Sequence, residues 1–194
     1  ALEQVARAHR QPGQRIIAMP VDLTHRDGPK ELIDRARATV GSVDVLVNNA
    51  GLFSPGYFED TTDDELDQMV ALNVTSLMRL TRLAMPDMLR RNTGHIVNMG
   101  SLAGLGAAAF VETYSATKHA VVGFSRSLRA SLQQRKSKVS VSVVCPGYVS
   151  DAGMYADLER DYEVKASKLM GTSKPEDVAK AVLKAIEKDE PELI

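Results

Sequence analysis

The sequence has no tryptophan, one cysteine and few aromatic residues, which make up 5% of its 194 residues. A single cysteine cannot form an internal disulfide. Cys145 follows an apolar run, so we predict a small core residue and not a catalytic thiol. The histidines and acidic residues do not cluster at the spacing of metal ligands, and we therefore predict no metal site.

The chain also lacks a charge excess and a long hydrophobic run. Its formal net charge of −1 gives no electrostatic reason to bind nucleic acid or an anionic membrane. The one basic cluster, at 135–138, is expected to solvate a helix end. No apolar run is long enough to cross a bilayer, so we expect a cytoplasmic protein without a membrane partner. The chain does not begin with methionine, which leaves open an N-terminal targeting segment.

What the sequence does contain is an alternation of two patterns within one predicted domain, residues 1–194. Apolar, β-branched runs predict strands buried on both faces, at 15–23, 43–50, 95–100 and 139–145. Helical spacing separates them, at 30–40, 63–91 with a kink at Pro86, 112–135 and 174–188. This order predicts an α/β fold, a doubly wound parallel sheet with helices on both faces.

Polar or turn-forming residues follow every predicted strand. They are Asp22, Asn48 to Gly51, Ser101, and Pro146 with Gly147. Ligands of such sheets bind beyond the carboxyl ends of the strands. The sequence therefore predicts a binding site along this edge.

One glycine-rich stretch, "MGSLAGLG", resembles a phosphate-binding loop. Gly100, Gly104 and Gly106 follow a predicted strand, as such a loop requires. However, a phosphate loop runs directly into a helix, and the next predicted helix begins only near Glu112. We interpret the stretch as a flexible wall of a pocket and keep the phosphate loop as the weaker alternative.

The stretch "YSATK" places Tyr114 and Lys118 four residues apart, on one face of a helix. An ammonium group beside a phenol favours the phenolate, so we expect the pKa of Tyr114 to be lowered. Tyr114 would then act as a general acid or base. Ser101 could hold the reacting oxygen by a hydrogen bond.

These motifs together resemble the short-chain dehydrogenase/reductase family. The matching stretches, in the order of the family, are Asp22-Leu23, "NNAG" at 48–51, Asn73 in "ALNVTS", "GHIVNMGS" ending in Ser101, "YSATK", and "PGYV" at 146–149. The resemblance covers nearly the whole chain. It implies a Rossmann-like fold and hydride transfer between NAD or NADP and a carbonyl or alcohol substrate.

The resemblance also implies roles for single residues. Tyr114 would transfer a proton to or from the substrate oxygen, Ser101 would position that oxygen, and Lys118 would bind ribose hydroxyls. Asn73 would hold a water in a proton relay, or, alternatively, would bond only to backbone. The residues that would line the cofactor are Asp22, Leu23, Asn49, Ala50, Gly51, Tyr114, Lys118, Pro146, Gly147 and Val149.

The implied partners are a small, possibly apolar, carbonyl or alcohol compound and a second copy of the chain. The substrate pocket would lie between 102–111 and 148–170, and the protein would form a homodimer or homotetramer. Asp151 stands where the family often has threonine, which puts one cofactor contact in doubt.

The resemblance further implies that the N-terminal strands and glycine-rich segment of the family are missing, and that the chain ends as the last strand begins. We expect exposed strand edges as a result. The alternative function is a non-catalytic binding or oligomerisation module.

Overall fold

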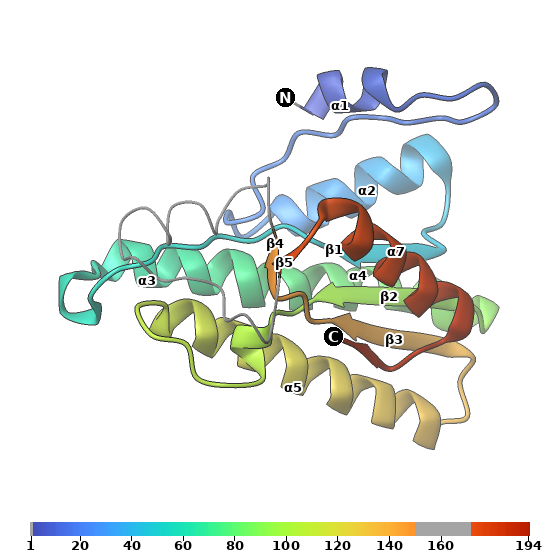
Figure 1. The fold of residues 1–194 in the computed structure, drawn as a ribbon. Coiled ribbons are helices and arrows are strands. Elements are labelled where there is room, and N and C mark those ends of the chain that lie inside the picture. The colour runs from blue at the N-terminus through green and yellow to red at the C-terminus, as the bar shows by residue number, and fades with distance from the viewer. Residues whose placement is uncertain (1, 150–171) are drawn as a thin grey trace.

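A parallel sheet lies at the centre of the computed structural model, which describes residues 2–149 and 172–194 (Figure 1). Its strands are β1 (Val45–Asn48), β2 (Gly94–Met99), β3 (Val139–Val144) and β6 (Glu192–Leu193), in the order β1-β2-β3-β6. All three pairings are parallel. A second, two-stranded parallel sheet joins β4 (Tyr148–Val149) to β5 (Thr172–Ser173). The predicted parallel α/β architecture is thus confirmed.

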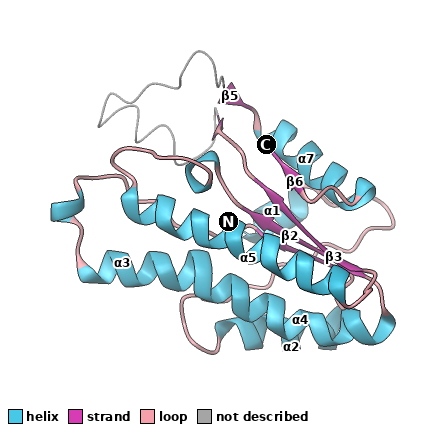
Figure 2. Ribbon diagram, turned by 90° about the horizontal axis from the view of Figure 1, so that it is seen from below, coloured by secondary structure: helices cyan, strands magenta, loops and turns pink. Residues whose placement is uncertain are grey.

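Helices cover both faces of the sheet (Figures 1 and 2). The helices are α1 (Leu2–Ala8), α2 (Gly28–Val40), α3 (Asp63–Val70), α4 (Leu77–Arg91), α5 (Glu112–Gln134) and α7 (Pro175–Lys188). Short turns η1 (Phe58–Asp60) and η3 (Leu102–Gly104) lie in the connections. Helices α4 and α5 pack on one face of β2 and β3, and α7 packs on the other.

The alternation of side chains along β2 and β3 builds a core on each face. Ile96 and Val141 are fully buried against α2, α4 and α5. Val97 and Val144 point the opposite way and pack with Ala185 of α7. Apolar side chains on both faces explain why these strands appear in the sequence as continuous apolar runs.

The prediction of a strand at 15–23 was wrong. Residues 15–21 adopt no regular structure, and β1 is an edge strand of the described four-stranded sheet. An apolar pattern reports burial, whereas a strand also needs a hydrogen-bonding neighbour, and no described segment pairs with these residues. Leu23 instead packs beside the core between α2 and α4.

The predicted helix at 63–91 is interrupted, but not by Pro86, which lies inside α4. A π-helical turn, η2 (Ala71–Ser76), separates α3 from α4. Such turns insert extra backbone and are frequent at functional sites. This one contains Asn73, whose side chain bonds outside its own helix.

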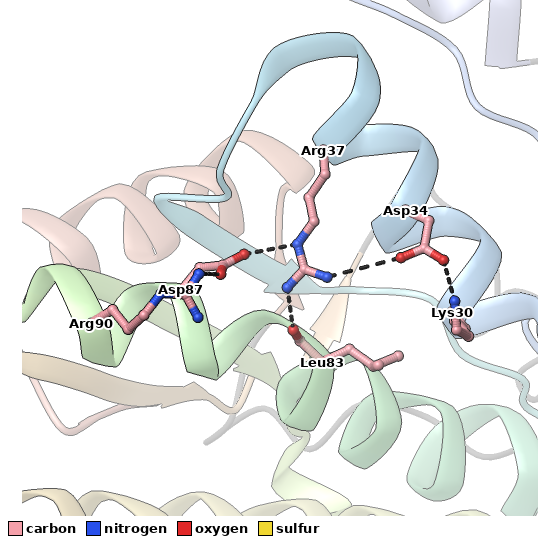
Figure 3. A network of polar contacts seen from close by, with 6 residues as sticks. All are labelled: Lys30, Asp34, Arg37, Leu83, Asp87 and Arg90. Atoms are coloured by element: carbon pink, nitrogen blue, oxygen red, sulfur yellow. Dashed lines mark hydrogen bonds and ion pairs between the residues drawn. The ribbon is translucent and has the colours of Figure 1, made fainter.

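Arg37 joins α2 to α4 through a network of polar contacts (Figure 3). Its Nε donates to Oδ2 of Asp87 at 2.8 Å and its Nη2 to the carbonyl oxygen of Leu83 at 2.8 Å. Asp34 lies 3.9 Å from the same guanidinium, and Arg90 also pairs with Asp87. A hollow of about 270 Å³ lies beside this network. Its arginines already have carboxylate and carbonyl partners, so we regard the network as a structural link between the two helices.

Candidate active site

Ser101 directly follows β2 and caps the short turn η3. Its Oγ accepts a hydrogen bond from the backbone N–H of Ala103 at 3.2 Å. The same hydroxyl lies near enough to the phenol of Tyr114 to lower the pKa of that phenol. The structure therefore brings together the serine and the tyrosine that the sequence placed on a strand end and a helix.

Lys118 lies one turn after Tyr114 on α5, with its Nζ 5.4 Å from the centroid of the phenol ring. Only 7% of Lys118 is exposed. Nζ donates a hydrogen bond of 2.8 Å to the carbonyl oxygen of Met99. An ammonium has three donors, so two remain available to a ligand at this end of the sheet.

The expected lowering of the Tyr114 pKa is not found. Burial of the phenol raises its pKa above the ordinary value of 10, and the hydroxyl of Ser101 offsets only part of this effect. The ammonium of Lys118 lies over the ring and bonds to Met99, not to the phenolic oxygen. Tyr114 is therefore a protonated phenol at neutral pH, ready to donate.

Burial acts in the opposite direction on Lys118, because its charged form is the protonated one. The pKa of Lys118 falls from 10.5 to about 8 through loss of hydration. A group with this pKa is still mostly protonated at pH 7. The site thus holds a neutral phenol beside a cation.

Asn73 clamps the loop that follows β1. Its Oδ1 accepts from the backbone N–H of Leu52 at 2.7 Å, and its Nδ2 donates to the carbonyl oxygen of Leu52 at 2.9 Å. Nδ2 also donates to Oγ1 of Thr117, one residue before Lys118. Both amide protons are used, so the side chain ties the loop to α5.

Gly51 lies between these groups. A Cβ atom at this position would approach Oδ1 of Asn73 to 3.3 Å and Nζ of Lys118 to 3.9 Å. Asn49 and Ala50 precede it at the end of β1, and both are exposed. The lack of a side chain at Gly51 keeps the approach to Lys118 open.

The segment after β3 reaches the same edge. The carbonyl oxygen of Pro146 accepts from the N–H of Leu102, next to Ser101, at 3.0 Å. A Cβ on Gly147 would meet Leu102 at 3.1 Å, so these two segments pack closely. Val149 follows in β4 and is partly buried.

Asp22 and Leu23 lie at the entry to α2. Oδ1 of Asp22 accepts from the N–H and the hydroxyl of Thr24, and these hydrogen bonds lower the pKa of the carboxyl group. Gly28 packs so closely on the carbonyl of Asp22 that a Cβ there would clash at 1.9 Å. Asp22 thus contacts its own turn and the start of α2.

Two sequence predictions fall outside the described residues: the contact at Asp151 and most of the pocket wall at 148–170. Within residues 2–149 and 172–194, no three metal-ligating side chains form a group. No helix in the same ranges has the length and hydropathy needed to cross a membrane.

Cys145 is fully buried in a core cluster with Val121 and Val143, and burial raises the pKa of its thiol to about 11. The prediction of a small core residue is thus confirmed.

The sequence analysis missed a buried chain of polar side chains beneath the site. Nδ2 of Asn48 donates to Thr81 and to Oδ1 of Asn98, and Nδ2 of Asn98 donates to Ser125. Asn98 is fully buried within β2. The sequence feature that could have indicated this chain is an asparagine inside an apolar run. A buried amide needs hydrogen-bond partners, so such a residue predicts other buried polar groups nearby. The chain fixes β1 and β2 against α4 and α5.

Phe53 was also missed, although it touches the central residue of the site. Its ring packs edge-on against Tyr114, with 4.9 Å between centroids and an interplanar angle of 86°. A single aromatic residue in a loop carries no periodic signal that could have indicated this contact.

The arrangement as a whole suits proton transfer to an oxygen atom. Ser101 and Tyr114 present two neighbouring hydroxyls, and the serine lowers the pKa of the phenol. A carbonyl or alcohol oxygen placed against both would lie within reach of a proton.

Known proteins resemble this chain in sequence and in fold. A family model described as short chain dehydrogenase matches residues 1–163. Ketoacyl reductase HetN from a Nostoc species is 39% identical over 193 residues, which cover 100% of this chain and 65% of HetN. Nodulation protein G of Rhizobium meliloti is 37% identical over 140 residues, or 72% of this chain and 56% of that protein. The chain thus spans less than two thirds of the length of either relative.

Solved structures show the same fold. A short chain dehydrogenase/reductase from Burkholderia phymatum in complex with NAD has a TM-score of 0.86 and 25% identity, over 99% of this chain and 75% of that one. A short-chain dehydrogenase from Sphingobium yanoikuyae in complex with NADPH has a TM-score of 0.84 and 25% identity, over 100% and 73%.

Proposed function

Because this chain belongs to the short-chain dehydrogenase family, we propose that it is an oxidoreductase that interconverts a carbonyl compound and a secondary alcohol with NAD or NADP. The observation that carries the proposal is the constellation of Ser101, Tyr114 and Lys118 at the carboxyl edge of the sheet. A module without catalysis would not need a buried lysine over a partly buried phenol. We therefore do not favour the alternative of a non-catalytic binding or oligomerisation module.

Tyr114 is the proton donor in the direction of reduction. Its raised pKa keeps the phenol protonated at neutral pH, so Oη can give its proton to the substrate oxygen. Ser101 orients that oxygen through its hydroxyl. In the direction of oxidation the phenol must first lose its proton to solvent, and Oη of the resulting phenolate would then take the proton of the alcohol. The nicotinamide ring, when bound, supplies or accepts the hydride.

Lys118 fits the hydroxyl groups of a ribose. Two of its three donors are available beside Gly51, where the backbone leaves room for a ligand. Asn49 and Ala50 at the end of β1, with Pro146, Gly147 and Val149 after β3, would line the cofactor. Complexes of structural relatives with NAD and with NADPH support such a site in this fold.

Asn73 would act mainly as a structural clamp and less as the holder of a relay water. Its contacts with Leu52 and Thr117 favour a clamp for the loop over a direct holder of water. Oδ1 keeps one lone pair, and a relay water could use it. Asp22 and Leu23 would meet the far end of the cofactor from the start of α2.

The proposed partners are an apolar carbonyl or alcohol compound and a second copy of the chain. Support for the second copy comes from apolar side chains that α3 and α4 leave exposed: Val70 is 45% and Met78 36% accessible. Such side chains suit a homodimer or homotetramer of the kind that the family resemblance implies.

Replacing the phenol hydroxyl tests the proposal. We expect Tyr114→Phe to lower turnover of a ketone with NADH or NADPH by about 100-fold or more, since it removes the general acid. The Kd of the reduced coenzyme should stay within about twofold, because this ring does not lose its packing. Turnover is measured from the absorbance change as the coenzyme is oxidised. The Kd is measured by titration of coenzyme fluorescence.

The matched control is Ser131→Ala, which removes an exposed hydroxyl from the same helix, α5, several turns beyond Tyr114. Turnover by Tyr114→Phe equal to that of this control would refute the proton-transfer role.

A further inference from the structure

We propose that Phe53 positions the phenol of Tyr114 and sets the size limit for the apolar group that the substrate carries beside its carbonyl. The proposal rests on the function proposed above. It starts from the edge-on contact between the two rings. Phe53 comes from the loop after β1, two residues beyond the proposed cofactor-binding stretch at Asn49 to Gly51.

The loop that carries Phe53 is held at its first end by Asn73. This side chain takes both backbone polar groups of Leu52, the residue immediately before Phe53. Asn73 is itself 2% exposed and is bonded to Thr117 of α5. Since Tyr114 lies on the same helix, α5 fixes both partners of the ring contact.

The other end of the loop is held by the segment before α5. The N–H of Gly56 donates to the carbonyl oxygen of Phe110 at 2.9 Å. The rings of Tyr57 and Phe110 meet edge to face, 5.7 Å apart at 90°. Phe53 is thus placed between two anchors.

Phe110, which makes both contacts of this second anchor, has a strained backbone conformation. Its φ of +63° lies in the left-handed region, which a phenylalanine seldom adopts. Oε1 of Glu112 accepts from the N–H of Phe110 at 3.2 Å and supports the conformation. Strain of this kind is found where neighbouring structure over-determines a functional site.

The ring of Phe53 therefore acts on Tyr114 in two ways. It covers one side of the phenol, which excludes water, and its edge-on position restricts the tilt of the phenol ring. A proton donor held in this way keeps its oxygen aligned with the substrate oxygen.

The same ring limits what can lie beside the substrate carbonyl. Phe53 lies against Tyr114, and the rings of Tyr57 and Phe110 form a second pair at the other end of the loop. The carboxylate of Glu112 accepts from the backbone N–H of Phe110. An apolar alkyl or aryl group fits against such rings, and a carboxylate does not. We infer a neutral ketone or secondary alcohol whose apolar substituent is limited in size by Phe53.

The first test measures Tyr114 without turnover. The ionisation of Tyr114 is obtained from tyrosinate absorbance as the difference between the protein and its Tyr114→Phe variant. We expect Phe53→Ala to lower the pKa of Tyr114 by about half a unit or more, because water reaches the phenol. Phe53→Leu, which keeps an apolar cover, should restore most of the shift. An unchanged pKa in Phe53→Ala would overturn the positioning role, whatever the turnover.

The second test compares two neutral ketones, one with a small alkyl substituent and one with a bulky aryl substituent. We expect Phe53→Ala to shift the ratio of their kcat/KM values toward the bulky ketone by about tenfold or more. Phe58→Ala is the matched control, since that ring is 57% exposed. An equal ratio in Phe53→Ala and the control would overturn the size limit. Absence of turnover in the unmodified chain would instead refute the proposed function. The pKa measurement would still show whether Phe53 shields Tyr114 from water.

Discussion

Lys118 shows, at the scale of a single residue, how function and stability oppose each other. Burial lowers its pKa from 10.5 to about 8, so the folded protein binds this proton less tightly than the unfolded chain. Stability therefore rises with pH between about 8 and 10.5, and the full cost of burying the ammonium is present at pH 7. A shift of this size corresponds to roughly 3 kcal/mol.

We predict that Lys118→Met raises the free energy of unfolding at pH 7 by roughly 2 kcal/mol, because the relief of burial exceeds the lost hydrogen bond to Met99. The gain should shrink as pH rises from 8 toward 10.5. Urea unfolding at several pH values measures it, with Lys184→Met as the control at an exposed lysine. If Lys118→Met is less stable than the unmodified protein at pH 7, burial of the ammonium does not lower the free energy of unfolding as proposed.

At the scale of elements, side-chain contacts contribute more than backbone hydrogen bonds of the sheet to holding the C-terminal strand in place. β6 has only two residues, and Arg126 binds Glu192 there with two hydrogen bonds of 2.8 Å. Arg129 reaches the side chain and carbonyl of Asp189, both at 2.9 Å. Ser142 of β3 donates to the carbonyl oxygen of Glu190 at 2.5 Å. Together these contacts hold the turn between α7 and β6.

His95 supports this turn from β2. Its Nε2 lies 2.8 Å from Oγ of Ser142, and the Ser142 proton is directed to Glu190, so Nε2–H is the donor. Burial lowers the pKa of His95 below 6.5; Asp189 raises it and Arg129 lowers it. Because the folded pKa is the lower one, the unfolded chain takes up more protons, and stability falls as pH drops from about 6.5 through the folded pKa.

We predict that His95→Gln, which keeps a donor, has a smaller loss of stability than the unmodified chain as pH falls below about 6.5. The measurement is urea unfolding across that range. The control is His9→Gln, since His9 is exposed. Identical pH profiles for all three proteins would contradict the account of His95.

The elements differ in how far the sequence predicts them. β2, β3, α5 and α7 follow from local patterns, and their observed bounds lie within two residues of the predicted ones. The strand predicted at 15–23 is not formed, because a strand depends on pairing with a segment distant in sequence, which a local pattern does not report. The π-helical turn escaped prediction because its contact, from Asn73 to Leu52, joins residues 21 positions apart.

The site divides in the same way. Ser101, Tyr114 and Lys118 were predicted because strand ends and a four-residue spacing are local features. Phe53 and the Asn48–Asn98 pair depend on contacts between loops or strands, which no local pattern encodes. The raised pKa of Tyr114 could not be predicted either, because burial is a property of the folded chain.

At the scale of the whole molecule, structural ion pairs and the candidate active site lie in different places. Ion pairs such as Arg37 with Asp87 and Arg129 with Asp189 tie helices and turns together away from the site. The proposed catalytic residues gather where β1 and β2 end, as ligand sites do in parallel sheets. The account therefore requires that a nicotinamide coenzyme binds at this edge, beside Gly51.

A fluorescence titration of the purified chain with NADH and with NADPH tests this requirement most directly, together with Gly51→Val and Gly123→Val. A side chain at Gly51 meets Asn73 and Lys118, whereas a Cβ at Gly123, on the exposed face of α5, meets nothing within 4 Å. We predict saturable binding by the unmodified chain and by Gly123→Val, and binding at least about tenfold weaker by Gly51→Val. No saturable binding by the folded chain, or equal binding by all three proteins, would contradict the proposed site.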